Sequence, residues 1–256
     1  MLPGVCRICG STGPLSFEHT PPRAAFNNRP VVRYRFEDLV ELGPDARPRG
    51  PVQQRGMGSH SLCERCNNTT GAWYAKPFID WCYQGMDVLV RSRGRPTLIY
   101  LNYLFPLAIL KQILTMFFAI SHPAFAAANE EIVTLVLNRE AMYLSHRYRV
   151  FAYYNITGLM RQTPLSVKLD TAAMQSYFMT EISYPPFGYL MTIDSPPPDR
   201  RLIEISHFAR YAYNEFAVAE VRMPLLPTHL LYPGDYRTRQ EIIDGRVRGV
   251  ESPLGA

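Results

Sequence analysis

The chain has 256 residues, of which 47% are hydrophobic, 12% aromatic and 19% charged, enough apolar material for at least one buried core, which excludes a disordered chain. The 27 basic residues exceed the 22 acidic ones, giving a net charge of +5 and a pI near 9.0; this mild excess permits a polyanionic partner without requiring one. Five cysteines cannot all pair, and the opening MLPGVCRICG lacks a charged and then apolar signal sequence. We therefore expect a cytoplasmic protein whose thiols are free or bound to metal.

A shift in composition predicts two domains. Four of the five cysteines lie before residue 67, and residues 1–85 are rich in Gly, Pro, Arg and Cys, whereas residues 86–256 are rich in Tyr, Phe, Leu, Ile and Met. We predict a small zinc-binding domain followed by a larger α+β domain with a mainly antiparallel sheet.

Two Cys-x-x-Cys pairs predict a metal site. Cys6 and Cys9 form the first pair, and Cys63 and Cys66 form the second. Two-residue spacing lets both sulfurs of a pair turn toward one ion, and four thiolates match tetrahedral zinc. A closed four-sulfur shell leaves no position for substrate, so this zinc would be structural. A redox dithiol and a chance arrangement are the alternatives. The fifth cysteine, Cys82, follows Trp81 and is interpreted as a packed residue.

Three polar residues near these pairs are candidates for chemistry. Glu18 and His19 end a short alternating run, in which Leu15 and Phe17 would pack and Glu18 would face an open space. The following prolines would bend the chain so that His19 turns toward the same space. Asn67 directly follows Cys66, so a zinc ion that fixes Cys66 also fixes Asn67.

The order C-x-x-C, acid-His, C-x-x-C-Asn resembles the HNH endonucleases, also called ββα-metal or His-Me finger nucleases, in the four-cysteine form of the endonuclease VII type. The resemblance covers about residues 6–80. It implies that Glu18 and Asn67 hold one Mg²⁺ or Mn²⁺ ion and that His19 is the general base that activates water against a phosphodiester. The acid is Glu where the family more often has Asp, and no histidine lies between Asn67 and His122.

The residue types fit that chemistry independently of the resemblance. A hard divalent cation prefers carboxylate and amide oxygens, and an imidazole with a pKa of about 6.5 accepts a proton near neutral pH. The alternative interpretation is an exposed acid and a satisfied histidine in a turn, with Asn67 and Asn68 as helix caps.

The segment Thr20–Gly58 is interpreted as an insertion between two strands. It carries seven arginines and four acids: Arg23, Arg29, Arg33, Arg35, Arg47, Arg49 and Arg55 against Glu37, Asp38, Glu41 and Asp45. An arginine-rich loop suits phosphate contact, and a solvated loop is the alternative. His60 is either an auxiliary site residue or a structural one. After Asn67 we expect a helix with an apolar side formed by Trp73, Tyr74, Phe78 and Trp81, which Pro77 either kinks or divides.

The larger domain begins with predicted strands at Asp87–Arg91 and Thr97–Tyr103 and helices at Pro106–Ser121 and Asn129–Asn138. Six strand-like segments follow: Tyr148–Ile156, Ser166–Leu169, Gln175–Ile182, Gly188–Ile193, Leu202–Ala209 and Glu215–Met223. They predict an antiparallel sheet with helices on one face, and Tyr236–Arg248 predicts a last basic helix.

One apolar run, Leu98–Ile120, is as long as a membrane span. Lys111 and Gln112 at its centre and Pro106 within it favour a strand followed by a core helix with a narrow polar stripe. We therefore expect no membrane partner.

These observations predict a zinc-stabilised, Mg²⁺- or Mn²⁺-dependent endonuclease that hydrolyses DNA, with nucleic acid as its partner and a homo-oligomer as an option for cutting two strands. The alternative is a non-catalytic zinc module that binds nucleic acid or a protein.

Overall fold

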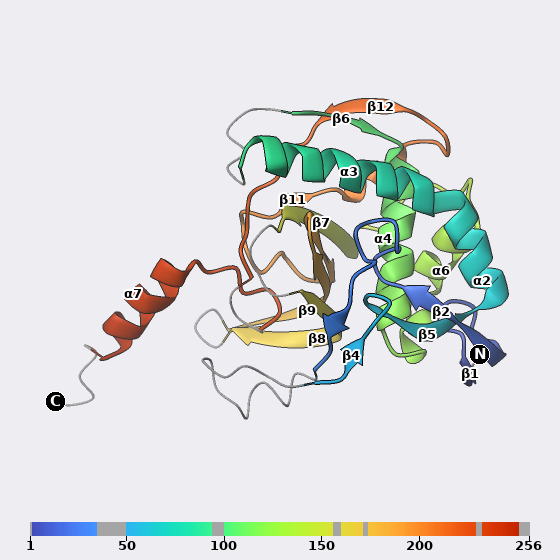
Figure 1. The fold of residues 1–256 in the computed structure, drawn as a ribbon, viewed down its shortest axis with the longest axis horizontal. Helices are drawn as coiled ribbons and strands as arrows, with labels where there is room; N and C mark the ends of the chain where they lie inside the picture. The colour runs from blue at the N-terminus through green and yellow to red at the C-terminus, as the bar shows by residue number, and fades with distance from the viewer. Residues whose placement is uncertain are drawn as a thin grey trace.

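The computed structural model contains both helices and antiparallel sheets, which confirms the predicted α+β class (Figure 1). The structure describes residues 2–34, 50–93, 100–155, 160–170, 174–228 and 232–250. Seven of the predicted loop residues, Arg35, Glu37, Asp38, Glu41, Asp45, Arg47 and Arg49, lie outside the described residues.

The N-terminal segment forms a small antiparallel sheet with strand order β1-β2-β5. Its strands are β1 (Leu2–Val5), β2 (Thr12–His19) and β5 (Gly58–Cys63). Two short strands, β3 (Val31–Val32) and β4 (Val52–Gln53), pair with each other in the segment between β2 and β5. Strand β5 ends at Cys63 and the next helix begins at Glu64, so no loop separates the strand from the helix.

That helix is continuous over three segments: α2 (Glu64–Thr70), a π-helical turn η1 (Gly71–Ala75) and α3 (Lys76–Arg91). Pro77 lies in the first turn of α3, where its missing N–H costs little, so it opens this segment, which was one of the two predicted outcomes. The predicted strand at Asp87–Arg91 is wrong, because these residues complete α3. The reason is visible in the spacing of the residues that α3 buries, which recur every three or four positions: Phe78, Trp81, Cys82, Gly85, Val88 and Leu89.

A five-stranded antiparallel sheet with the order β11-β7-β10-β9-β8 forms the centre of the fold. Its strands are β7 (Tyr148–Tyr154), β8 (Arg161–Asp170), β9 (Gln175–Tyr184), β10 (Phe187–Ile193) and β11 (Ile203–Glu204). The predicted strand at Leu202–Ala209 is therefore mostly wrong, since a 3₁₀ helix, η2 (Ser206–Arg210), follows β11. The antiparallel sheet itself is confirmed.

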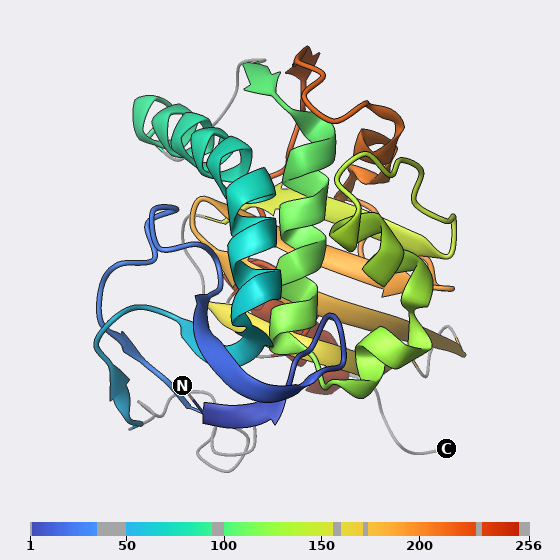
Figure 2. The same ribbon diagram turned by 90° about the vertical axis from the view of Figure 1, so that its right-hand side faces the viewer.

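Helices cover one face of this sheet (Figure 2). The predicted core helix is confirmed as α4 (Pro106–Ile120), and the next predicted helix as α6 (Glu130–Leu137); a short helix, α5 (Ala124–Ala128), was not predicted. On the outer side of α3 lies a two-stranded sheet of β6 (Leu101–Leu104) and β12 (Ala217–Glu220). The last helix, α7 (Arg239–Val250), projects from the molecule, as Figure 1 shows.

Strand β7 shows how both faces of the sheet are buried. Val150, Ala152 and Tyr154 belong to the core cluster on the helix side, whereas Phe151 and Tyr153 belong to a second cluster that includes Tyr236 of the C-terminal segment. Successive side chains of a strand point to opposite faces. The run of apolar residues in β7 therefore indicates a sheet that is covered on both sides.

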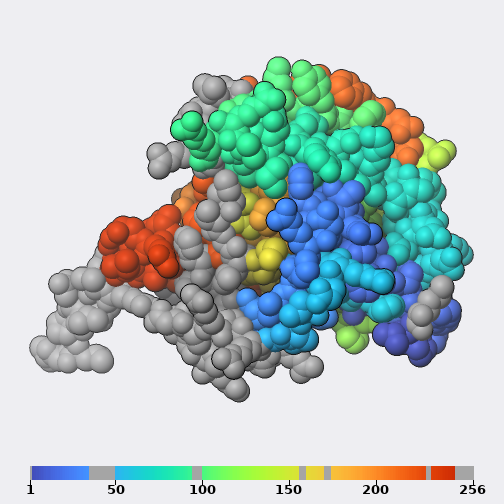
Figure 3. Space-filling model, in the orientation of Figure 1, coloured from blue at the N-terminus to red at the C-terminus, as the bar shows by residue number. Residues whose placement is uncertain are grey.

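The small N-terminal sheet shares its core with the large one. The helix-side cluster contains Cys6, Leu15 and Leu62 together with residues of α3, α4 and the large sheet. Arg7 also donates a hydrogen bond to the carbonyl of Ala119 at the C-terminal end of α4. The predicted domain boundary at residue 85 lies inside α3, and the division into two domains stays a prediction. In Figure 3 the N-terminal residues lie against α3 and the large sheet.

The predicted polar stripe of α4 faces protein rather than solvent. Lys111 is fully buried, and its ammonium donates to the carbonyls of Asn138 and Arg139, both at 2.8 Å, at the end of α6. These carbonyls directly follow the C-terminus of α6, where the negative end of the helix dipole also favours a cation. Burial lowers the pKa of Lys111 to about 8. Among the described helices, none is long and apolar enough to cross a membrane.

Gly85 allows α3 to approach β10 closely. A Cβ atom at this position would lie 2.2 Å from Cζ of Phe187, whose ring stacks on Trp81 with 4.5 Å between centroids. We predict that Gly85→Ala lowers the free energy of unfolding by about 1–3 kcal/mol because the ring must move. The control is Gly71→Ala, where a Cβ meets nothing within 4 Å and the better helix former should be neutral or stabilising. Urea titration measures both, and equal stability of the two variants would contradict this packing.

Candidate functional site

The four predicted cysteines come together. The sulfurs of Cys6, Cys9, Cys63 and Cys66 all lie within 4.8 Å of one another, and those of Cys9 and Cys63 are 3.8 Å apart. A zinc ion bonded to four sulfurs at about 2.3 Å requires sulfur separations near 3.8 Å. The donor set and its spacing therefore fit a tetrahedral zinc ion, and the convergence of both pairs argues against an isolated redox dithiol.

Local backbone geometry turns the sulfurs inward. In the turn after β1, Gly10 adopts φ 72° and its N–H donates to the carbonyl of Cys6 at 3.0 Å; a residue with a side chain rarely adopts this φ. At the other pair, Cys63 is the N-cap of α2, and its sulfur accepts from the N–H of Cys66 at 3.5 Å. A thiolate is favoured at a helix N-terminus because the dipole presents its positive end there.

The thiols of Cys6 and Cys66 also shift each other's pKa. Hydrogen bonding with the thiol of Cys66 lowers the pKa of Cys6 to about 4, against the opposing effect of burial, and the N–H groups of Cys63, Cys9 and Ile8 add to the lowering. The same pairing raises the pKa of Cys66. Thus Cys6 is already suited to bind as a thiolate, and a divalent cation would remove the remaining protons.

We predict that Cys63→Ser removes zinc and unfolds the N-terminal sheet, because one of the four metal ligands is lost while serine can still cap α2. Cys82→Ser is the matched control, since Cys82 is buried in the core and lies outside the cluster. Zinc content by atomic absorption and circular dichroism check both variants. Retention of one zinc per chain by Cys63→Ser would contradict the ligand assignment.

Glu18 and Asn67 are brought together on one side of β2. The Asn67 amide donates to Oγ of Ser16 at 3.0 Å, and that hydroxyl donates to the carbonyl of Leu62 at 2.9 Å. The amide also interacts with the carboxyl of Glu18. Ser16 and Glu18 are two residues apart and therefore share a strand face. Ser16, which the sequence did not single out, thus orients Asn67 toward Glu18.

Burial raises the pKa of Glu18 to about 7, although the Asn67 amide lowers it in part. The folded protein therefore holds this proton more tightly than the unfolded chain, in which the usual pKa is near 4.5. The contribution of Glu18 to stability is fully present below pH 4.5 and is lost as the pH rises through 7.

We predict that zinc-loaded wild-type protein without Mg²⁺ or Mn²⁺ loses about 1 kcal/mol of unfolding free energy between pH 6 and pH 8 relative to Glu18→Gln. The substitution removes the titrating group and keeps a similar shape. Urea unfolding of both proteins at the two pH values measures the difference. Parallel stability curves would show that Glu18 does not titrate in this range.

His19 lies on the other side of β2. Its Nε2 hydrogen-bonds the carbonyl of Arg55 at 3.0 Å, and its ring meets Phe17 edge-on with 4.9 Å between centroids. Since a carbonyl only accepts, Nε2 carries the proton and Nδ1 of the neutral ring is free to act as a base. Burial lowers the pKa of His19, the Arg55 carbonyl opposes this, and the charges of Arg23 and Arg55 lower it further.

Of the three residues expected to face one space, Glu18 and Asn67 lie together, whereas His19 faces the other side of β2. Leu15 is buried, but Phe17 is half-buried beside His19, and Glu18 faces Asn67 and α2 rather than an open space. Within the described residues no hydrogen bond joins His19 to Glu18 or Asn67. The reason is the alternation of an extended strand, which continues through His19 instead of ending before it.

Asn27 fixes the segment that carries His19, and no sequence pattern pointed to this residue. This residue is fully buried; its amide donates to the carbonyls of Pro21 and Met57, both at 2.7 Å, and its Oδ1 accepts from the N–H of Met57 at 2.6 Å. Pro21 is two residues after His19, and Met57 is two residues after Arg55. Asn27 therefore sets how the imidazole meets the Arg55 carbonyl.

We predict that Asn27→Ala lowers the free energy of unfolding by roughly 2–4 kcal/mol, because three backbone groups lose their partner. Asn28→Ala should change it by less than about 0.5 kcal/mol, because Asn28 is exposed. Thermal unfolding of the two variants is the measurement. Unchanged stability of Asn27→Ala would mean that water or other groups replace these hydrogen bonds.

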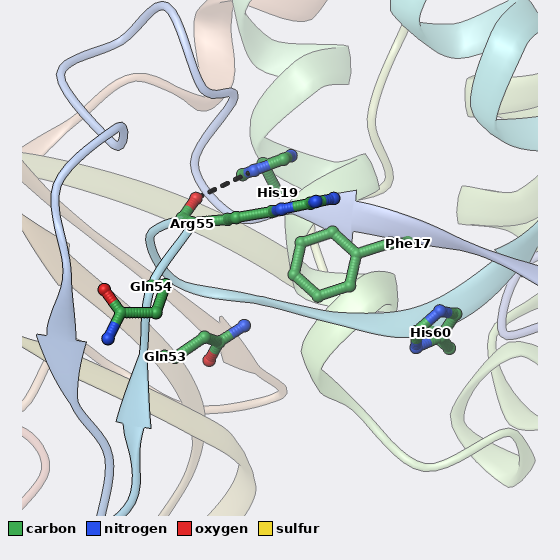
Figure 4. A pocket seen from close by; sticks show the side chains of 6 residues that line it. All are labelled: Phe17, His19, Gln53, Gln54, Arg55 and His60. Carbon is green, nitrogen blue, oxygen red and sulfur yellow. Dashed lines mark hydrogen bonds between the residues drawn. The ribbon is translucent and has the colours of Figure 1, made fainter.

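A hollow of about 500 Å³ lies on the His19 side of β2 (Figure 4). Its lining comes from two segments and consists of Phe17, His19, Gln53, Gln54, Arg55 and His60. His60 is thus beside the predicted base, across the ring of Phe17 at 5.4 Å between centroids. Of the four arginines in the described parts of the insertion, Arg23 and Arg55 lie near His19.

In comparisons with known proteins, the chain matches no family model, no curated protein and no solved structure.

Proposed function

We propose that the protein is a divalent-metal-dependent endonuclease that hydrolyses phosphodiester bonds in DNA. The observation that carries the proposal is the half-buried carboxyl of Glu18 beside the Asn67 amide, one residue before an imidazole whose Nε2 is held by the Arg55 carbonyl. The strand pair β2–β5, followed at once by α2, also has the order of elements that a ββα-metal finger requires.

Glu18 and Asn67 supply oxygen donors for a Mg²⁺ or Mn²⁺ ion. The amide hydrogens of Asn67 face Ser16 and Glu18, and its oxygen can serve as a ligand when the side chain turns. A cation beside Glu18 would offset the desolvation that raises its pKa. When bound, such an ion neutralises charge on the phosphate and on the leaving oxygen.

His19 takes the proton of the attacking water on Nδ1. The Arg55 carbonyl holds the ring through Nε2 and favours the imidazolium that this transfer produces. The lowered pKa keeps the ring neutral before the reaction at pH 7. Positive charge from Arg23 and Arg55 suits an incoming phosphate.

Separation of His19 from Glu18 and Asn67 agrees with in-line displacement. The attacking water and the leaving oxygen lie on opposite sides of the phosphorus atom. The base that activates the water and the ligands of the ion at the leaving oxygen should therefore lie on opposite sides of the phosphate. They need not touch each other. The end of β2 offers both groups on its two faces.

We predict that His19→Ala lowers plasmid cleavage in Mg²⁺ or Mn²⁺ by about 10²–10⁴-fold without changing zinc content. Asn67→Ala should instead raise the Mn²⁺ concentration needed, so that activity partly returns at high Mn²⁺. The exposed His146→Ala is the control.

Supercoiled plasmid on an agarose gel is a sufficient assay. Equal nicking by wild type and His19→Ala would discard the role of His19. No nicking by any variant across several substrates would leave the zinc module that binds without cutting as the better description.

A further inference from the structure

The hollow beside His19 has the lining of a binding site for one nucleotide. Its volume of about 500 Å³ is within the range of small-molecule pockets. It combines aromatic rings, side-chain amides and one guanidinium, and none of the described carboxylates lines it. Glu18, the acid of β2, lies on the opposite face of the strand. The lining therefore favours an anionic ligand with a flat ring.

Three rings form one wall of the hollow. Phe17 stands between His19 and His60, with centroid distances of 4.9 and 5.4 Å and an interplanar angle of 78° in both pairs. Figure 4 shows the Phe17 ring directed toward the side where Gln53 and Gln54 lie. A half-buried aromatic ring that lines an open hollow is a stacking platform for a base.

The other residues of the lining supply polar groups. Gln53 donates through Nε2 to the carbonyl of Gly58 at 3.0 Å, which leaves its Oε1 for a ligand. Gln54 and Arg55 are exposed, and the guanidinium of Arg55 makes no ion pair within the described residues. Side-chain amides can pair with base edges, and a free guanidinium binds phosphate.

We propose that this hollow binds one unpaired nucleotide next to the phosphate that is cut, with its base against Phe17 and its phosphate against Arg55. The proposal rests on the endonuclease function and names its substrate class. A base inside a duplex is already stacked on both faces and cannot present a face to Phe17 without leaving the stack. Single strands and strands with an extrahelical nucleotide should therefore bind best.

The test is fluorescence anisotropy with zinc-loaded full-length protein and no added Mg²⁺ or Mn²⁺, so that binding is measured without cleavage. The probes are a labelled 12-nucleotide DNA strand, its fully paired duplex, a duplex with one unpaired nucleotide, and the RNA strand of the same sequence. We expect the two DNA probes with unpaired nucleotides to bind about 10-fold more tightly than the paired duplex.

Variants locate the binding site. Phe17→Leu should lower affinity for the single strand by about 10-fold, and Arg55→Gln should lower it by a similar factor while keeping the backbone carbonyl that holds His19. Because Phe17 packs over Gly58, thermal unfolding checks its fold, and the exposed Arg55 provides a test that does not depend on packing. The control is Val52→Ala, an exposed apolar residue of β4 that does not line the hollow.

Equal or tighter binding of the paired duplex overturns the proposal, as does wild-type affinity in both Phe17→Leu and Arg55→Gln. Binding that depends on Phe17 and Arg55, without cleavage in Mn²⁺, supports the hollow and rejects the endonuclease function. Cleavage that does not depend on Phe17 and Arg55 supports the endonuclease function and rejects nucleotide binding in the hollow. Tighter binding of RNA than DNA supports the hollow and moves the substrate from DNA to RNA.

Discussion

Convergence of four cysteine sulfurs is the constraint on which the N-terminal half of the molecule depends. The two pairs are separated by 53 residues in the chain, yet the sulfurs of Cys9 and Cys63 lie 3.8 Å apart. One pair sits in the turn between β1 and β2, and the other joins β5 to α2. A metal ion that binds all four therefore fixes β2, which carries Glu18, against the helix that carries Asn67. Thiolate bonds to zinc would add to the stability that this sheet gains from the core it shares with the large sheet.

The strand β2 divides the chemistry of the site between its two faces. Ser16, Glu18 and Asn67 form a polar group on the helix side, whereas Phe17 and His19 face a hollow on the other. Asn27 ties the residues after His19 to those after Arg55. The larger sheet adds two further ties, since Gln162 donates to the carbonyl of Thr20 and Tyr184 donates to that of Phe26. The proposed site is thus positioned by the zinc cluster, by a buried amide and by the large sheet.

The sequence was most informative where the signal is local. The Cys-x-x-Cys spacing predicted the cluster, and Pro106 with a continuous apolar run predicted α4. It failed at Asp87–Arg91, because a short run rich in Val and Leu reads equally well as a strand or as the end of a long helix, and α3 continues through it. It could not find Asn27, whose three bonds join segments that are distant in sequence. The sequence also could not predict the orientation of His19, because alternation alone does not show whether the strand ends before or after that residue.

The two metal sites are tested most directly by anomalous diffraction from crystals of the protein grown with zinc and soaked in Mn²⁺, recorded at the absorption edges of both metals. We expect zinc at about 2.3 Å from all four sulfurs and a separate manganese between the carboxylate of Glu18 and the amide of Asn67. Manganese elsewhere, or a zinc ion bound by fewer than four of these cysteines, would contradict this expectation.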